Sequence, residues 1–163
     1  MKNIILNVAS PIIKPGPFIS PWLARAFFIL SLIGLGDATY LTAKHYLGGP
    51  ITCSLFQGCE KVLTSQYSVM WGVPVALLGV IYYLAILALI TGFIFTERAT
   101  LFRIAAKLTP LGLAASLWFL YLQAFVIHAF CLYCLISTTL STLLFILEMY
   151  SLVITKNKNL YGQ

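Results

Sequence analysis

The chain has 163 residues, of which 61% are hydrophobic and only 9% are charged, and its formal net charge is +6 at pH 7. A soluble domain of this length cannot bury so much apolar surface, so most of it must face lipid, and the length allows one membrane domain. The positive residues occur in short stretches between apolar runs and form no basic stripe, which argues against a nucleic-acid-binding surface.

The first 21 residues precede the first long apolar run and contain Pro11, Pro15, Pro17 and Pro21. The apolar run at 4–6 is too short for the core of a signal peptide, and no small-residue cleavage site follows a proper apolar region. We therefore expect residues 1–21 to form a flexible, uncleaved cytoplasmic tail.

Four apolar runs are long enough to cross a bilayer, because a spanning helix needs about 20 residues. We predict these spans at about 25–46, 71–95, 108–127 and 131–154. The expected fold is therefore an all-α integral membrane protein. It is a bundle of four transmembrane helices over residues 22–155, followed by a cytoplasmic tail at 156–163.

The connections between the spans differ in length. A Gly-Gly-Pro turn signal at 48–50 opens a polar loop that extends to about residue 70, and Pro74 fits the first turn of the second helix. Residues 96–107 are predicted to be a short charged connection between the second and third spans.

Lysine and arginine placement predicts the orientation of the bundle. One side carries the larger set, which consists of Lys2, Lys14, Arg25, Arg98, Arg103, Lys107, Lys156 and Lys158. The other side carries Lys44 and Lys61. Because cytoplasmic loops are enriched in these residues, we expect both termini in the cytoplasm and the long loop outside. All four cysteines then lie at or near the outer, oxidising face.

Cys131 and Cys134 form a Cys-x-x-Cys pair at the start of the fourth span. A dithiol at this spacing can close into a disulfide and pass two electrons on. The amino end of a helix stabilises a thiolate, whereas apolar surroundings oppose its ionisation. The alternative is a pair of inert, buried cysteines. The position of the pair at the membrane edge favours redox chemistry.

Cys53 and Cys59 form a second pair in the outer loop. On its own, this pair suits a structural disulfide. Disulfide exchange becomes the better interpretation because a second dithiol lies near the same membrane face. The competing use of four cysteines is a zinc or other soft-metal site, with His45 or His128 as spare ligands.

Other polar and aromatic residues near the outer face are candidates for ligand contacts. Asp37 lies inside the first span, where an ionisable group is costly and suggests a proton route, a polar ligand contact, or an internally satisfied residue. Ser65 can donate a hydrogen bond to a carbonyl-bearing ligand. Trp71 is placed as an interfacial anchor, and Tyr133 either lines a pocket or faces lipid.

Taken in order, the motifs resemble those of the vitamin K epoxide reductase family, in its bacterial branch. They are GDATYLT at 36–42, Cys53 and Cys59 with five residues between them, VLTS at 62–65, GVPVALLG at 72–79, and Cys131-x-x-Cys134. The match extends from about residue 33 to 137 and is specific in both order and spacing.

The resemblance implies a four-helix bundle around a quinone, with part of the outer loop folded as a short helix over the mouth of the site. It implies that Cys53 exchanges with an outside protein and that Cys59 exchanges with Cys131. Cys134 would face the quinone ring, with Ser65 as a polar neighbour. We also take Asp37, Tyr133 and Trp71 as candidate quinone contacts.

The resemblance also implies a partner and a location. The expected partner is a separate thioredoxin-like oxidase outside the membrane, because the fused thioredoxin-like domain of many bacterial relatives does not follow Lys158. The expected location is the bacterial cytoplasmic membrane. The quinone would be ubiquinone-like or menaquinone-like. Thr138 stands where vertebrate members carry a tyrosine, which favours quinone reduction over epoxide reduction.

Two alternatives stay open from the sequence. Disulfide generators of the DsbB type also have four helices, but they carry Cys-x-x-Cys in the first outer loop, whereas here the motif comes last. The other alternative is a metal-binding or structural membrane protein that uses the four cysteines as ligands.

Overall fold

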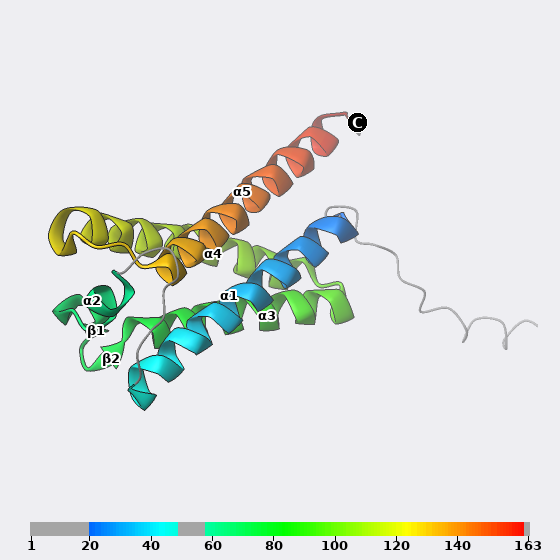
Figure 1. The fold of residues 1–163 in the computed structure, drawn as a ribbon. Helices are drawn as coiled ribbons and strands as arrows, with labels where there is room; N and C mark the ends of the chain where they lie inside the picture. Colours follow the sequence, from blue (N-terminus) through cyan, green and yellow to red (C-terminus); the bar gives the residue numbers. More distant parts are fainter. Residues whose placement is uncertain (1–19, 49–57, 162–163) are drawn as a thin grey trace, which may run out of the picture.

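The computed structural model describes residues 20–48 and 58–161, with side chains described as far as Ile154. Within these ranges the chain forms a multi-pass bundle of four helices that are long and apolar enough to span a membrane, which confirms the predicted fold class (Figure 1). They are α1 (Pro21–Leu47), α3 (Val75–Thr96), α4 (Ala99–Tyr121) with its π-helical extension η3 (Leu122–Ile127), and α5 (Leu132–Tyr161).

Local sequence explains where several helices begin and end. Pro21 opens α1, where the missing N–H of proline costs nothing, and the N–H of Gly48 caps the helix by donating to the Lys44 carbonyl. Glu97 closes α3 in a left-handed conformation, with its N–H donating to the Phe93 carbonyl over 2.8 Å.

The predicted charged connection at 96–107 is wrong in its length. Only Glu97 and Arg98 separate α3 from α4, so Arg103 and Lys107 lie on the helix. Both side chains are exposed, and long cationic side chains at the end of a spanning helix can extend their charge to water. Charge in this segment therefore marked the membrane edge rather than a break in the helix.

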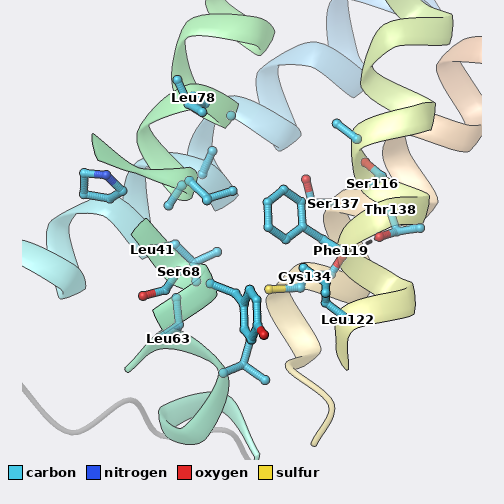
Figure 2. A pocket seen from close by; sticks show the side chains of 18 of the residues that line it. Leu41, Leu63, Ser68, Leu78, Ser116, Phe119, Leu122, Cys134, Ser137 and Thr138 are labelled. Atoms are coloured by element: carbon cyan, nitrogen blue, oxygen red, sulfur yellow. Dashed lines mark hydrogen bonds between the residues drawn. The ribbon is translucent and has the colours of Figure 1, made fainter. Parts of the chain in front are cut away.

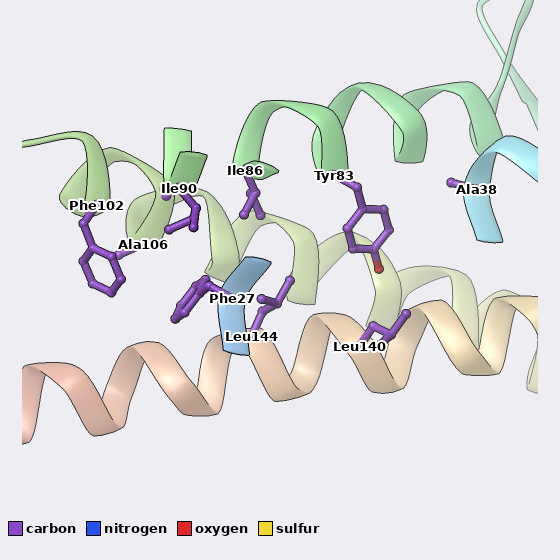
Figure 3. Packing of buried hydrophobic residues seen from close by; sticks show 10 residues of the cluster. Phe27, Ala38, Tyr83, Ile86, Ile90, Phe102, Ala106, Leu140 and Leu144 are labelled. Carbon is purple, nitrogen blue, oxygen red and sulfur yellow. The ribbon is translucent and has the colours of Figure 1, made fainter. Parts of the chain in front are cut away.

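The bundle core lies between α1, α3, α4 and α5 (Figure 3). Phe27 packs edge-on against Phe102 with ring centroids 5.3 Å apart, and Ile86 and Leu144 are fully buried beside them. Figure 3 shows Tyr83 extending from α3 toward α5, near Leu140. Its ring lies against Gly34 of α1, where a Cβ atom would collide with it. This glycine permits the close approach of α1 and α3.

Short elements cover one end of the bundle (Figure 1). The helix α2 (Cys59–Leu63) matches the short helix that the family resemblance implies, and the 3-10 turn η2 (Gln66–Ser68) follows it. Strands β1 (Val69–Met70) and β2 (Val73–Pro74) then pair antiparallel. The hairpin was not predicted. Trp71 and Gly72 both have positive φ, as this tight turn requires, and tryptophan is an unusual residue there.

The hairpin also shifts the start of the second span. We predicted its first residue at about 71 with Pro74 in the first helical turn, whereas α3 begins at Val75 and Pro74 caps it in an extended conformation. The predicted tail at 1–21 falls outside the described residues except for its last two. In the segment predicted as the C-terminal tail, the helix α5 continues to Tyr161.

Replacement of Gly34 by alanine should destabilise the bundle, because the new Cβ collides with the Tyr83 ring. Overpacking of this kind costs about 1–3 kcal/mol. Thermal unfolding in detergent measures the loss. Gly36→Ala is the matched control on the same helix, since nothing lies within 4 Å of its Cβ position. Equal midpoints for the two variants would contradict the packing argument.

Candidate active site

Two of the predicted redox cysteines are buried in one small cluster at the covered end of the bundle. Cys59 and Cys131 are 1% and 0% exposed, and they pack with Leu41 and Val62. Cys59 is disulfide-bonded, whereas Cys131 and Cys134 carry free thiols. Cys53 lies outside the described residues, so its role stays a prediction.

Close backbone packing holds Cys59 beside the Cys-x-x-Cys motif. A Cβ atom added at Gly58 would lie 2.7 Å from the Phe130 carbonyl oxygen and 3.1 Å from Ala129 Cβ. Side chains do not tolerate such distances, so only glycine lets the start of α2 reach the segment that leads into Cys131. The loop cysteine and the motif are thereby brought together.

A side-chain hydrogen bond fixes the start of the motif. Gln123 is 2% exposed and lies in η3, and its Oε1 accepts the backbone N–H of Cys131 over 2.8 Å. The N–H of Ala129 donates to the Gln123 backbone carbonyl over 3.1 Å, and His128 adopts a left-handed conformation in the turn between them. Wide helical turns of this type are frequent at functional sites. Sequence analysis missed this positioning role of Gln123.

Cys131 stands immediately before α5, and its carbonyl accepts the N–H of Leu135 over 3.0 Å. A thiol at this point meets the positive end of the helix dipole. The side-chain hydrogen bond with Cys134 lowers the pKa of Cys131 below its ordinary value, against the opposing effect of burial. The direction that the sequence left open is therefore toward the thiolate.

Cys134 lies one helical turn further on, in the wall of a cavity of about 440 Å³ (Figure 2). Figure 2 shows its sulfur directed into the cavity, near Phe119 and Leu122. Most of the lining is apolar. The polar or aromatic lining residues include Asp37, Ser65, Tyr67, Tyr82, Tyr83, Ser116, Phe119, Ser137, Thr138 and Ser141.

Two buried polar atoms of the cavity wall have no hydrogen-bond partner among the described residues. They are Asp37 Oδ2 and the hydroxyl oxygen of Tyr82. An unsatisfied buried polar atom is costly, and such atoms are often completed by water or a ligand. Asp37 was a predicted ligand contact. Tyr82 was missed, because the sequence of an apolar span does not show which of its tyrosines face inward.

The remaining predicted contacts fall in different places. Ser65 lines the cavity, and its hydroxyl donates to the Val62 carbonyl over 2.7 Å, so donation to a ligand would require that bond to open. Tyr133 is not among the lining residues, and its ring packs 5.0 Å from that of Tyr40. Trp71 is 98% exposed in the hairpin turn and does not line the cavity either.

The part of the chain that the structure describes contains no cluster of side chains suited to a metal ion, which was the alternative use of the cysteines. No three His, Cys, Asp or Glu side chains there are placed to hold one ion. His45 lines the cavity and His128 is exposed in the turn before the motif. Cys53 lies outside the described residues.

Known proteins resemble this chain over most of its length. A sequence profile described as the Vitamin K epoxide reductase family matches residues 25–149. The chain is also 30% identical over 135 residues to the thiol-disulfide oxidoreductase LTO1 of Arabidopsis thaliana. That alignment covers 77% of this chain and 36% of the plant protein, so the chain spans little more than a third of that relative.

The pH dependence of Cys131 alkylation tests whether the hydrogen bond with Cys134 lowers the pKa of Cys131. We expect Cys134→Ala to raise the pKa of Cys131 by removing the bond, so that the thiolate forms only at a higher pH and reactivity near neutrality falls. Cys134→Ser is the matched control, since a hydroxyl can still donate. The measurement uses a Cys53→Ser/Cys59→Ser background and a small alkylating reagent. Coincident profiles for the two variants would contradict this assignment.

Proposed function

The chain belongs to the vitamin K epoxide reductase family, and we propose that it passes electrons from an exported protein dithiol through its cysteines to a quinone. Membrane thiol–disulfide oxidoreduction is the general activity that the family and the plant relative support. The observation that carries the finer proposal is the arrangement of the motif: Cys131 packs against Cys59, while Cys134 opens into the cavity.

The first part of the proposed relay is disulfide exchange. A thiolate of the partner attacks the disulfide between Cys53 and Cys59, and the resulting dithiol then reduces the disulfide between Cys131 and Cys134. Each exchange breaks one S–S bond and forms another. Burial of Cys59 and Cys131 supports an order of events in which a protein partner attacks at Cys53 and does not reach Cys59 or Cys131 directly.

The second part takes place at the cavity. A volume of about 440 Å³ lies within the usual range of small-molecule sites, and the apolar wall with Phe119 and Tyr67 suits a flat ring. The unpartnered oxygens of Asp37 and Tyr82 offer polar contacts to ring carbonyls, with Asp37 donating when it is protonated. When bound, a quinone supplies a lipid-soluble acceptor for two electrons.

Oxidation of Cys131 and Cys134 forms their S–S bond and releases two electrons and two protons, which is what conversion of a quinone to its quinol consumes. The chain's own residues orient this step: Gln123 holds the motif in place, and the mostly apolar wall surrounds the ring. Thr138 also lines the cavity, and its hydroxyl donates to the Cys134 carbonyl over 2.8 Å. Donation to an epoxide oxygen would require that bond to open, which supports quinone reduction over epoxide reduction.

The partner and the orientation complete the proposal. A thioredoxin-like protein or domain on the non-cytoplasmic side would donate the electrons and thereby support disulfide formation in exported proteins. The distribution of lysine and arginine supports cytoplasmic termini, with the cysteine end of the bundle on the oxidising side.

Anaerobic quinone reduction by the purified protein in detergent tests the terminal step. With a small dithiol as donor, the parent should reduce a ubiquinone-like or menaquinone-like acceptor. Cys134→Ala should fall to background because no S–S bond can form with Cys131. Absence of reduction by the parent with both acceptors would contradict the proposed function.

Replacement of both loop cysteines tests the shuttle. In Cys53→Ser/Cys59→Ser, oxidation of a reduced thioredoxin-like protein should fall by at least about tenfold, whereas oxidation of a small dithiol should change far less. The reason is that Cys131 is fully buried and only a small molecule can reach it. Gly58→Val keeps all four thiols but separates Cys59 from Cys131, so it should show the same selective loss. Equal losses of both activities would count against the shuttle.

A further inference from the structure

The inward face of α5 carries polar side chains far beyond the cysteine motif. Ser141 and Glu148 are 2% and 7% exposed, seven residues apart on the same helix face. Glu148 lies fourteen residues after Cys134, which is about 21 Å along a helix, toward the opposite end of the bundle. An ionisable residue inside a membrane span is costly and marks a functional site by default.

Hydroxyl groups connect the cavity with the middle of α5. The Tyr83 hydroxyl can donate to the Ser137 backbone carbonyl over 3.1 Å, and it also lies 3.0 Å from Ser137 Oγ and 3.3 Å from Ser141 Oγ. Ser116 of α4 donates to Ser141 over 3.1 Å. These serines line the cavity, and each link joins a group that can both donate and accept a proton.

A second set of contacts lies deeper in the bundle, where the Thr109 hydroxyl of α4 lies within hydrogen-bonding distance of both the Ala106 carbonyl and the Glu148 carboxyl group. The Tyr82 side chain lies in the interval between the two sets. It rests against Gly112, where a Cβ atom would collide with it. Gly112 is one helical turn from both Thr109 and Ser116, and the Tyr82 oxygen has no partner among the described residues. Gly112, Tyr82 and Ser116 all line the cavity, so water there can complete the links.

We propose that these hydroxyl groups, together with the Glu148 carboxyl, form a proton relay. It supplies protons to the cavity from the membrane side opposite the cysteines, with Glu148 as its entry group. The row consists of Glu148, Thr109, Tyr82, Ser116, Ser141, Tyr83 and Ser137. The inference rests on the proposed quinone reduction and adds the source of its protons.

The relay completes the balance of the reaction. Two electrons pass from the Cys131 and Cys134 thiols to the quinone as their S–S bond forms, and the two thiol protons leave on the cysteine side. Two protons enter through Glu148 and convert the reduced quinone to quinol. Each turnover therefore removes two protons from the side opposite the cysteines.

Proteoliposomes that trap a pH-sensitive dye test the direction of proton uptake. A membrane-impermeant dithiol added outside drives only those molecules whose cysteine end faces outward. The parent should make the lumen alkaline in proportion to the quinol formed. Quinone reduction without a luminal change would overturn the relay but leave the proposed function intact, whereas no quinone reduction would remove both.

Glu148→Gln keeps the size and hydrogen-bonding capacity of the side chain, but it cannot carry the proton. It should slow luminal alkalinisation by at least about tenfold, in line with the loss of a proton-transferring group. Ser31→Ala is the matched control, because Ser31 is a buried serine of α1 whose hydroxyl donates to the Phe27 carbonyl and which lies outside the row. It should behave as the parent does. An unchanged rate in Glu148→Gln would overturn the assignment of Glu148.

Infrared spectroscopy of the quinone-free protein provides a readout that does not depend on turnover. The carboxyl band that disappears in Glu148→Gln should shift soon after transfer to deuterium oxide, since an entry group exchanges its proton with solvent. A band that stays unshifted while the protein remains folded would show a sealed, structural carboxyl group and overturn the relay.

Discussion

The hydrogen bond between the Cys131 N–H and the Gln123 side chain determines how the active end of the bundle is built. It ties the last turn of α4 and η3 to the first residue of the motif, so Cys131 stands at the start of α5 and not somewhere within a loop. From that position the helix directs Cys134 one turn deeper, into the cavity wall. In an apolar environment an unpaired N–H is expensive, and this cost keeps the arrangement in one geometry. The backbone therefore sets the positions of the two cysteines through which the proposed relay passes electrons.

Glycines at two close contacts allow the elements around the cysteines and the cavity to pack tightly. Gly58 lets α2 settle on the segment before Cys131, and Gly34 lets α1 and α3 enclose Tyr83. In the proposed relay, exchange between Cys59 and Cys131 takes place inside a buried cluster. Shielding of this kind matters for a thiol relay, because an accessible disulfide would react with any thiol that reached it.

The sequence predicted the four spans and their approximate positions, because this signal depends on local composition. It failed where three-dimensional packing decides. Charge at Arg103 and Lys107 was taken as a break, although long side chains let a helix continue into the membrane edge. The positioning role of Gln123 and the inward direction of Tyr82 were not predicted, since both depend on which face of a nearly all-apolar helix points inward. Asp37 was detected from its charge alone, whereas Trp71 and Tyr133 were assigned by proximity in sequence and lie outside the cavity wall.

The two redox steps place opposite demands on protons, and the bundle separates them in space. Disulfide exchange needs an attacking thiolate, and in the proposed direction Cys59 supplies it and attacks the disulfide between Cys131 and Cys134. Quinol formation would take up two protons at a cavity whose wall is mostly apolar. A group that protonated the attacking thiolate would suppress exchange, so a proton supply far from the cysteines suits both steps. Ser137 and Ser141 of α5 line the cavity, and the buried carboxyl of Glu148 lies two helical turns beyond Ser141, where in the proposed relay it serves the second step without disturbing the first.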